Sequence, residues 1–313
     1  MNAFSAKKIT ILTTVLVMAV LAGGVTIATL ARQPHAPAVP EGRETRVDLE
    51  RRVTSFTAAF GPHGGYRPPA RDERRAVADG VGLLLDGRRE EAVRRLSSVG
   101  YGLLTLTDRV TGRRFAEVAE AGGGTGRGWG RVYLDLDSPP RWSVQVPHPV
   151  ADRDTERFGV AVLRGTPGGV LVLAGAHRRA GRGNEADVAH RSDTVFHVVC
   201  GELVERGMPA VQAHGFADDS APGYDAIVST GRGEDGRDEA RELTRVLRDG
   251  GFEVCRAWAR RCPLEGRTNR QGRRAAVEEV PFLHLELSRS VRDDEELRTR
   301  TAEAVAATAA GWR

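Results

Sequence analysis

The chain has 313 residues, of which 40% are hydrophobic and 28% charged, a balance that supports a buried core and excludes a wholly disordered chain. The net charge is only +4, and arginines alternate with acidic residues throughout. The composition therefore indicates no basic face, and no nucleic-acid partner is expected.

The first predicted element is a membrane segment. Residues 9–31 contain no charged side chain, and a helix of this length, rising about 1.5 Å per residue, crosses the roughly 30 Å hydrocarbon core of a bilayer. Lys7 and Lys8 precede it, which predicts a cytoplasmic N-terminus with the rest of the chain outside. Residues 1–31 are interpreted as a single-pass cell-membrane anchor or, alternatively, as a signal peptide cleaved after Ala31 to leave a secreted protein.

An exported chain carries its cysteines in an oxidising compartment. Cys255 and Cys262 are close enough in sequence to form a disulfide across a turn, and Cys200 falls among apolar residues of a predicted helix. We therefore expect one disulfide and one buried thiol. No Cys-x-x-Cys pair occurs, which argues against a zinc site built from thiolates.

Two regions are expected between the membrane segment and residue 140. Residues 32–45 are rich in proline and alanine, which is typical of a linker. Residues 46–140 are expected to form a small α+β region. In it, apolar residues recur at helical spacing over 72–85 and 88–96, alternate over 101–118 as in a β-hairpin, and give way to a glycine-rich loop at 122–130.

Residues 141–313 are expected to form one α/β domain. Strand-like and helix-like patterns alternate there, which is typical of a mostly parallel or mixed sheet with helices on both faces. The predicted strands are 142–146, 169–174, 209–213, 225–229, 252–258 and 282–287, and the predicted helices are 193–206, 238–249 and 294–310.

Ionisable side chains lie at the ends of several of these strands. In open α/β sheets, ligands bind beyond the carboxyl ends of the strands. We expect four groups to share that rim: His148, His177, His214 and Glu286. Taken alone, each histidine is more often a structural residue than a ligand, and Glu286 has the alternative of pairing with Arg289 or Arg292.

Together these residues suggest a zinc site. A catalytic zinc ion needs three protein ligands and an open position for water. His148 and Asp152 supply two ligands from one loop, and His214 supplies the third from a neighbouring strand. Glu286 is the candidate base for the attacking water. Glu156 follows Thr155, a plausible N-cap, so its alternative role is in the first turn of a helix, and it is the reserve ligand.

The region 142–294 resembles a known family. The segments HPVADRDTE, VQAHGF, VSTG, LEGRTNR and HLELSRSVRDD occur in the order, and at about the separations, seen in phage-type poly-γ-glutamate hydrolases. The resemblance implies a zinc carboxypeptidase-like fold, distantly similar to N-formylglutamate amidohydrolases, and zinc-dependent cleavage of γ-glutamyl or other peptide amides. It matches the zinc ligands to His148, Asp152 and His214 and the catalytic glutamate to Glu286. The family's acidic ligand is a glutamate one position farther from the histidine, so Asp152 and Glu156 remain alternatives.

The expected substrate is a peptide, a γ-glutamyl compound or a cell-envelope polymer. A guanidinium group fits a carboxylate through two parallel hydrogen bonds, which makes arginines near strand ends candidates for substrate binding. The candidate residues are His177, Arg178, Arg179, Asn269, Arg270 and Arg289. The alternative is that each belongs to a solvated surface in a chain rich in arginine.

The sequence also suggests two other functions. Residues 231–236 spell G-x-G-x-x-G between a strand and a helix, the pattern of a dinucleotide site. Glu234 and Asp235 would face the pyrophosphate with negative charge, which argues against that site. The second hypothesis is a non-catalytic module that binds envelope polymers on a hydrolase fold. Stoichiometric zinc would favour the hydrolase, and its absence would favour the module.

Overall fold

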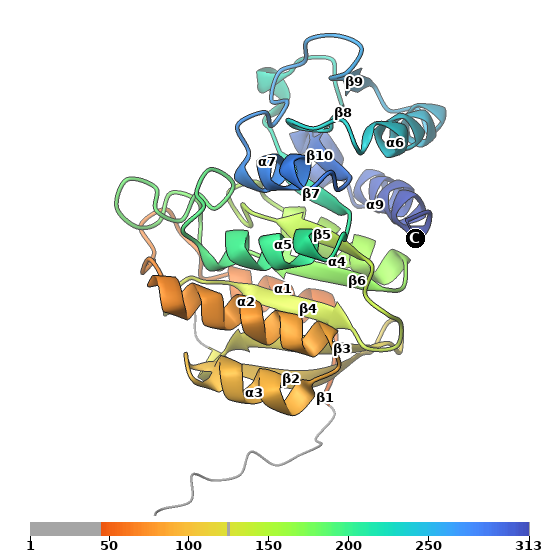
Figure 1. Cartoon of the computed structure of the whole chain (residues 1–313). Helices are drawn as coiled ribbons and strands as arrows, with labels where there is room; N and C mark the ends of the chain where they lie inside the picture. The colour runs from red at the N-terminus through yellow and green to blue at the C-terminus, as the bar shows by residue number, and fades with distance from the viewer. Residues whose placement is uncertain (1–44, 124–125, 313) are drawn as a thin grey trace, which may run out of the picture. The chain divides into compact units, whose positions relative to one another are not determined.

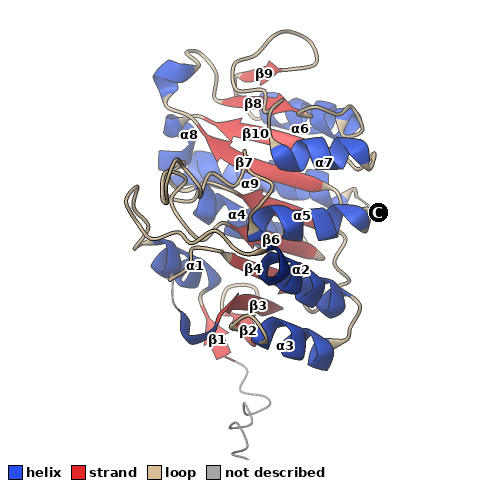
Figure 2. Ribbon diagram, turned by 60° about the vertical axis from the view of Figure 1, so that its left-hand side comes forward, coloured by secondary structure: helices blue, strands red, loops and turns tan. Residues whose placement is uncertain are grey.

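The computed structural model describes residues 45–123 and 126–312. The predicted membrane segment and almost all of the predicted linker lie outside these residues. Within the described part of the chain, no helix combines the length and the hydropathy needed to cross a bilayer. The described residues belong to one compact unit, and their strands form a ten-stranded sheet with helices on both faces (Figures 1 and 2).

The first half of the described chain supplies four strands and three helices. The two predicted helices correspond to α2 and α3, and the predicted hairpin corresponds to β2 and β3, which pair antiparallel. The other three elements, β1, α1 and β4, had no counterpart in the prediction. The bounds are β1 Thr45–Val47, α1 Leu49–Thr57, α2 Arg71–Leu85, α3 Arg89–Ser97, β2 Tyr101–Asp108, β3 Arg114–Glu120 and β4 Arg131–Asp135.

The second half alternates strands and helices as expected. The strands predicted at 142–146 and 282–287 have these same bounds in the structure, whereas the strand predicted at 252–258 is limited to three residues. The bounds are β5 Trp142–Val146, α4 Thr155–Gly165, β6 Gly169–Leu173, α5 Val195–Glu205, β7 Ala210–Gly215, β8 Ala226–Ser229, α6 Arg237–Asp249, β9 Val254–Arg256, α7 Arg270–Val277, β10 Phe282–Leu287, α8 Arg289–Asp293 and α9 Glu295–Ala310.

The sheet is mixed, and all ten strands belong to it. Its order is β1-β2-β3-β4-β6-β5-β7-β10-β8-β9. Strands β6, β5, β7 and β10 run parallel to one another, whereas β4 and β8 flank them antiparallel. The strands of region 46–140 thus extend the sheet of region 141–313. The four parallel strands end at a common edge, as expected for the candidate site.

Two hydrophobic clusters cover the two faces of the sheet. One contains buried residues of α1, α4, α6 and α9, and the other contains buried residues of α2, α3 and α5. The chain leaves β5 for α4 on one face and leaves β6 for α5 on the other, and β6 and β7 lie on opposite sides of β5. Loops that depart to opposite faces leave a crevice at the carboxyl ends of the strands, where ligands bind in open α/β sheets.

The cysteines are arranged as the sequence predicts. Cys255 and Cys262 form a disulfide, and Cys200 is a buried thiol in α5. The disulfide closes a loop that leads from β9 towards α7.

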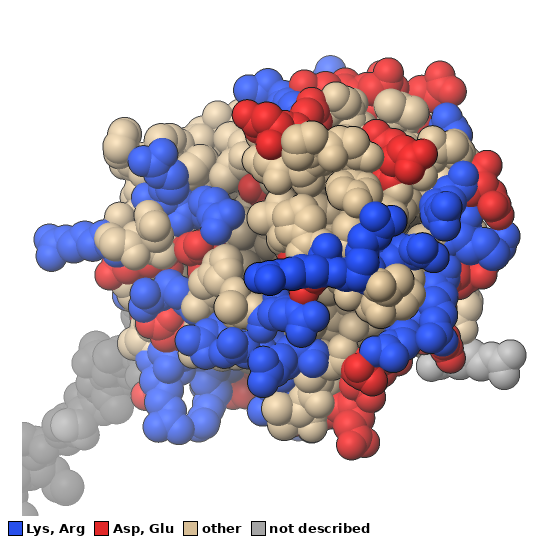
Figure 3. Space-filling model, turned by 90° about the horizontal axis from the view of Figure 1, so that it is seen from above, with Lys and Arg blue, Asp and Glu red and all other residues tan. Residues whose placement is uncertain are grey.

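The surface carries charges of both signs. On the face shown in Figure 3, basic and acidic side chains lie among one another. Helix α6 illustrates the pattern, since Arg241 pairs with Asp238 and Arg245 pairs with Glu242 within the helix. Exposed pairs of this kind contribute at most about 1 kcal/mol each, so they do not mark a site.

Candidate metal centre

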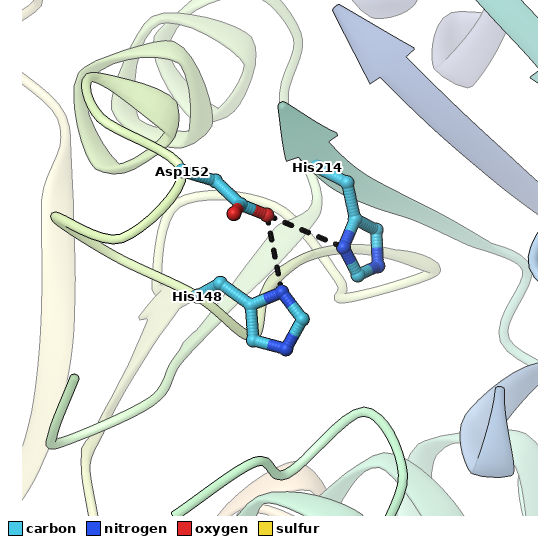
Figure 4. A group of neighbouring side chains, drawn as sticks. All are labelled: His148, Asp152 and His214. Atoms are coloured by element: carbon cyan, nitrogen blue, oxygen red, sulfur yellow. Dashed lines mark hydrogen bonds and ion pairs between the residues drawn. The ribbon is translucent and has the colours of Figure 1, made fainter. Parts of the chain in front are cut away.

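Three buried side chains converge at the carboxyl ends of β5 and β7. The Oδ2 atom of Asp152 lies 3.0 Å from Nδ1 of His148 and 3.5 Å from Nδ1 of His214 (Figure 4). The ligand atoms of the three residues lie within 4.8 Å of one another. Two imidazole nitrogens and one carboxylate oxygen at this spacing match the donor set of a zinc site.

The loop after β5 brings two of these residues together. His148 follows the end of β5, and the backbone N–H of Asp152 donates to the carbonyl of His148 at 2.9 Å. Val150 and Asp154 both adopt a positive φ of 67°, which costs about 1–3 kcal/mol at a residue other than glycine. Backbone strain of this kind is concentrated at functional sites. The predicted cap Thr155 is the first residue of α4, and Asp154 occupies the N-cap position.

In both histidines an oxygen atom of a neighbouring side chain contacts the second ring nitrogen, Nε2. The Nε2 atom of His148 lies 2.8 Å from Oδ1 of Asp187, and the Nε2 atom of His214 lies 2.7 Å from Oε1 of Gln212. An acceptor at Nε2 favours a proton on that nitrogen and fixes the orientation of the ring. Metal-binding histidines are usually oriented by such an acceptor on the second nitrogen.

The electrostatics of the cluster follow from burial and from these contacts. Burial raises the pKa of Asp152, but hydrogen bonds with His148 and His214 outweigh it and hold that pKa far below the usual range. Burial lowers the pKa of His214 to about 4, although its contact with Asp152 acts in the opposite direction. For His148, burial lowers the pKa, and contacts with Asp152 and Asp187 outweigh it and raise the pKa. The site thus holds an ionised carboxylate beside a neutral imidazole.

Glu286 lies next to the three converging side chains. It is on β10, directly opposite His214 of β7, and it is 7% exposed. Within the described residues its carboxylate has no hydrogen-bond partner, and burial together with the charge of Asp152 raises its pKa well above the usual value. Glu286 does not pair with Arg289 or Arg292, the alternative that the sequence offered. Arg289 pairs with Asp293, and Arg292 donates to three backbone carbonyls.

The reserve ligand Glu156 lies apart from the histidines. Its side chain is buried in the first turn of α4 and accepts a hydrogen bond from the backbone N–H of Val150 at 3.3 Å. Among the described residues it belongs to no group of ligand atoms around His148 or His214. Asp152 is the acidic residue that the structure places beside both histidines.

The candidate substrate residues fall into two groups. Arg178 lies at the candidate metal centre, where its Nη2 atom donates to Asp187 at 2.8 Å and its Nη1 atom lies 3.3 Å from Nδ1 of His148. His177 and Arg179 are on the same loop, and the backbone N–H of Arg179 donates to Nδ1 of His177. Arg270 is exposed at the start of α7, and its Nε atom contacts a backbone carbonyl.

Asn269 and Arg289 lie elsewhere. Asn269 is buried, caps α7 through a bond from the backbone N–H of Gly272, and donates to Gln212. Asn269 therefore acts on His214 indirectly, because it fixes the Gln212 side chain that contacts Nε2 of His214. Arg289 is held on α8 by its pair with Asp293, away from the histidines.

Three residues at the centre were missed by the sequence analysis: Asp187, Gln212 and His284. Gln212 and His284 each precede a predicted site residue by two positions on a strand, so strand alternation places them on the same face. That signal was available. Asp187 lies in the long segment between β6 and α5, where no periodic pattern indicates which side chains turn inward.

Comparison with known proteins assigns no family. No family model matches the chain, and no curated protein matches it. Several solved structures are similar at 13% identity. One is an N-formylglutamate amidohydrolase from Ralstonia eutropha JMP134 (TM-score 0.38, covering 55% of this chain and 92% of that one). Another is the apo, zinc-free form of YndL (0.35, 54% and 83%). A third is the catalytic domain of CwlV, an N-acetylmuramoyl-L-alanine amidase from Bacillus (Paenibacillus) polymyxa var. colistinus (0.33, 54% and 95%). TM-scores this low do not determine family or activity.

Proposed function

We propose that the chain is a zinc-dependent hydrolase that cleaves amide bonds, with a γ-glutamyl or related peptide bond as its substrate. One observation carries the proposal. His148 and His214 direct their Nδ1 atoms at the Asp152 carboxylate, and each has its Nε2 atom held by an oxygen acceptor. This is the arrangement expected of metal ligands that are oriented in advance.

The donor set fits zinc. Two imidazoles and one carboxylate are the three protein ligands of a known class of catalytic zinc sites, which keep a fourth position for water. A bound zinc ion would supply a water whose pKa is lowered towards about 7 and a Lewis acid for the substrate carbonyl. His148, Asp152 and His214 would hold it.

Glu286 is suited to move the proton. A general base works best when its pKa lies near the working pH, and burial raises the pKa of Glu286 in that direction. In the proposed reaction its carboxylate accepts a proton from the attacking water and delivers it to the leaving amide nitrogen. The lack of any other hydrogen-bond partner for this carboxylate among the described residues leaves it free for both transfers.

Arg178 is the residue proposed to hold the substrate. Its side chain is 33% exposed, so the guanidinium group is reachable from solvent while one edge is fixed by Asp187. A γ-glutamyl unit carries a free α-carboxylate, which a guanidinium group binds with good geometry. The same chemistry would suit an acidic cell-envelope peptide.

An extracytoplasmic location, with residues 1–31 as the membrane anchor, is part of the proposal. The disulfide between Cys255 and Cys262 supports it, because disulfides persist mainly in oxidising compartments. The test is protease treatment of intact cells that express the full chain with a C-terminal tag. Loss of the tag signal is expected, and its protection would contradict the proposed topology.

The function is tested by metal content and activity together. Plasma mass spectrometry of the purified full chain should find one zinc ion per chain in the wild type and none in His214→Ala. His63→Ala is the control and should keep its zinc, because His63 is exposed and belongs to no group of ligand atoms among the described residues. Glu286→Gln should keep the zinc and lose about 10²–10⁴-fold in the hydrolysis of γ-glutamyl or peptide amides. A wild type that takes up no zinc under any loading condition would reject the hydrolase in favour of a binding module.

A further inference from the structure

The described residues contain two further groups of possible ligand atoms, and one of these shares His214 with the first group. His214, His284 and Glu286 also bring three ligand atoms within 4.8 Å of one another. We call these residues the inner set, and His148, Asp152 and His214 the outer set. The two sets share His214. The proposed reaction gives His284 no role, so its presence in this cluster needs an explanation.

The sheet itself fixes the inner set. His214 of β7 and Glu286 of β10 are paired positions on adjacent parallel strands, and Gln212 is paired with His284 in the same way. Because alternate residues of a strand share one face, His284 and Glu286 point to the side on which His214 lies. The outer set, in contrast, takes two of its three residues from the loop after β5.

His284 behaves as a side chain that lacks a ligand. It is 3% exposed, and its Nδ1 atom is buried without a hydrogen-bond partner among the described residues. A buried polar atom left unsatisfied costs about 1–3 kcal/mol. Its ring stacks on that of His214, with the centroids 4.5 Å apart. On its other side the backbone of Gly266 approaches so closely that a Cβ there would lie 2.3 Å from the ring, so no side chain from that position can serve as a partner.

The carboxylate of Glu286 also lacks a partner. Glu286 is 7% exposed, it contributes a ligand atom to the inner set, and among the described residues its carboxylate accepts no hydrogen bond. A bound cation would compensate for its charge and give the free nitrogen of His284 a partner.

We propose that the inner set is an alternative zinc position that competes with the outer set for the same ion. Two cations cannot both be held through His214, since its Nε2 atom is occupied by Gln212 and only Nδ1 remains. In the inner position Glu286 is a ligand and cannot accept a proton from water. The inner form is therefore inactive, and this inference rests on the proposed function.

The test is the zinc content of variants of the full chain after equilibration with zinc and dialysis. Asp152→Ala breaks the outer set and is expected to keep one zinc ion per chain in the inner set. Asp152→Ala/His284→Phe breaks both sets and is expected to keep none. Phenylalanine retains a ring against His214 without a nitrogen, and Asp152→Ala/His284→Leu repeats the test with a smaller side chain. Circular dichroism verifies that each variant is folded.

A matched variant separates the inner set from the reserve ligand. Asp152→Ala/Glu156→Gln is expected to keep its zinc, because Glu156 contacts Val150 rather than the histidines. Loss of zinc in that variant, with retention in Asp152→Ala/His284→Phe, would assign the ion to Glu156 and overturn the inference. Loss of all zinc in Asp152→Ala alone would overturn the inference too, yet leave the proposed function intact. Only a wild type without zinc would reject both.

Discussion

His214 and Glu286 lie side by side on adjacent parallel strands, at paired positions of β7 and β10. A candidate ligand and a candidate base are thus separated by one strand spacing that the hydrogen bonds of the sheet maintain. His148 and Asp152, in contrast, reach the centre from a loop. One half of the centre thus lies in the sheet, and the other half lies in a loop.

Removal of Asp187 should weaken zinc binding. Its Oδ1 atom lies 2.8 Å from Nε2 of His148 and fixes the orientation of that ring. Asp187→Ala is expected to lower zinc affinity by about 10–100-fold, measured by competition with a chromogenic chelator. Asp193→Asn, which removes a charge that pairs with Arg191 away from the centre, is the control. Equal affinities in the two variants would show that the ring does not depend on Asp187.

Removal of the Arg178 guanidinium should impair substrates that carry a carboxylate. A hydrogen bond to a charged group contributes about 1.5–3 kcal/mol, so Arg178→Ala is expected to reduce kcat/KM by about 10–100-fold for such a substrate. The same substrate with its carboxylate amidated should be affected little. Arg182→Ala, on the same loop and exposed, serves as the control. A loss that is equal for both substrates would contradict a carboxylate-binding role.

The buried ion pairs of Glu117 should make stability depend on pH. Burial raises the pKa of Glu117, but its contacts with Arg52, Arg131 and Tyr133 outweigh it and hold the pKa below 4.5. A depressed pKa adds stability above 4.5, and this is lost as the pH falls through the folded-state value. Glu117→Gln is expected to cost about 3–5 kcal/mol in the free energy of unfolding at neutral pH.

Urea unfolding of both proteins over a pH series is the measurement for Glu117. The difference between wild type and Glu117→Gln should shrink steadily as the solution is acidified below 4.5. A difference that stays constant over that range would mean that the charge of Glu117 is not the origin of the effect.

Gly266 should be difficult to replace. It has a φ of 67°, and an added Cβ would lie 2.3 Å from Cδ2 of His284. Gly266→Ala is expected to cost more than the roughly 1–3 kcal/mol of backbone strain alone, since the ring of His284 must also move. Gly223→Ala shares the positive φ but has open space around it, so it isolates the backbone cost. Equal melting temperatures for the two variants would argue against close packing on His284.

Some strands could be predicted from the sequence and others could not, and the difference has a physical reason. Alternation and turn residues predicted β5, β7 and β10, whose buried faces produce strong local patterns. The three-residue strand β1 is too short to produce one. The insertion of β10 between β7 and β8, and the antiparallel direction of β8, depend on pairings between distant segments that periodicity does not encode.

The same distinction applies to the centre. The rule that ligands gather at the carboxyl ends of strands led to His148, His214 and Glu286, because these residues belong to strands or follow them directly. The partners that orient the histidines were missed. Asp187 reaches His148 from a segment without regular structure, and its position is set by tertiary packing rather than by local sequence.

The place of β10 in the sheet has a consequence for assembly during synthesis. This strand comes from near the end of the described chain, yet it joins β7 to the pair β8 and β9. Until residues 282–287 have emerged from the ribosome, β8 and β9 have no neighbour through which to join the rest of the sheet, and Glu286 is absent. A nascent chain can therefore bring His148, Asp152 and His214 together before it acquires its base, and the synthesis of β10 is the step that completes the centre.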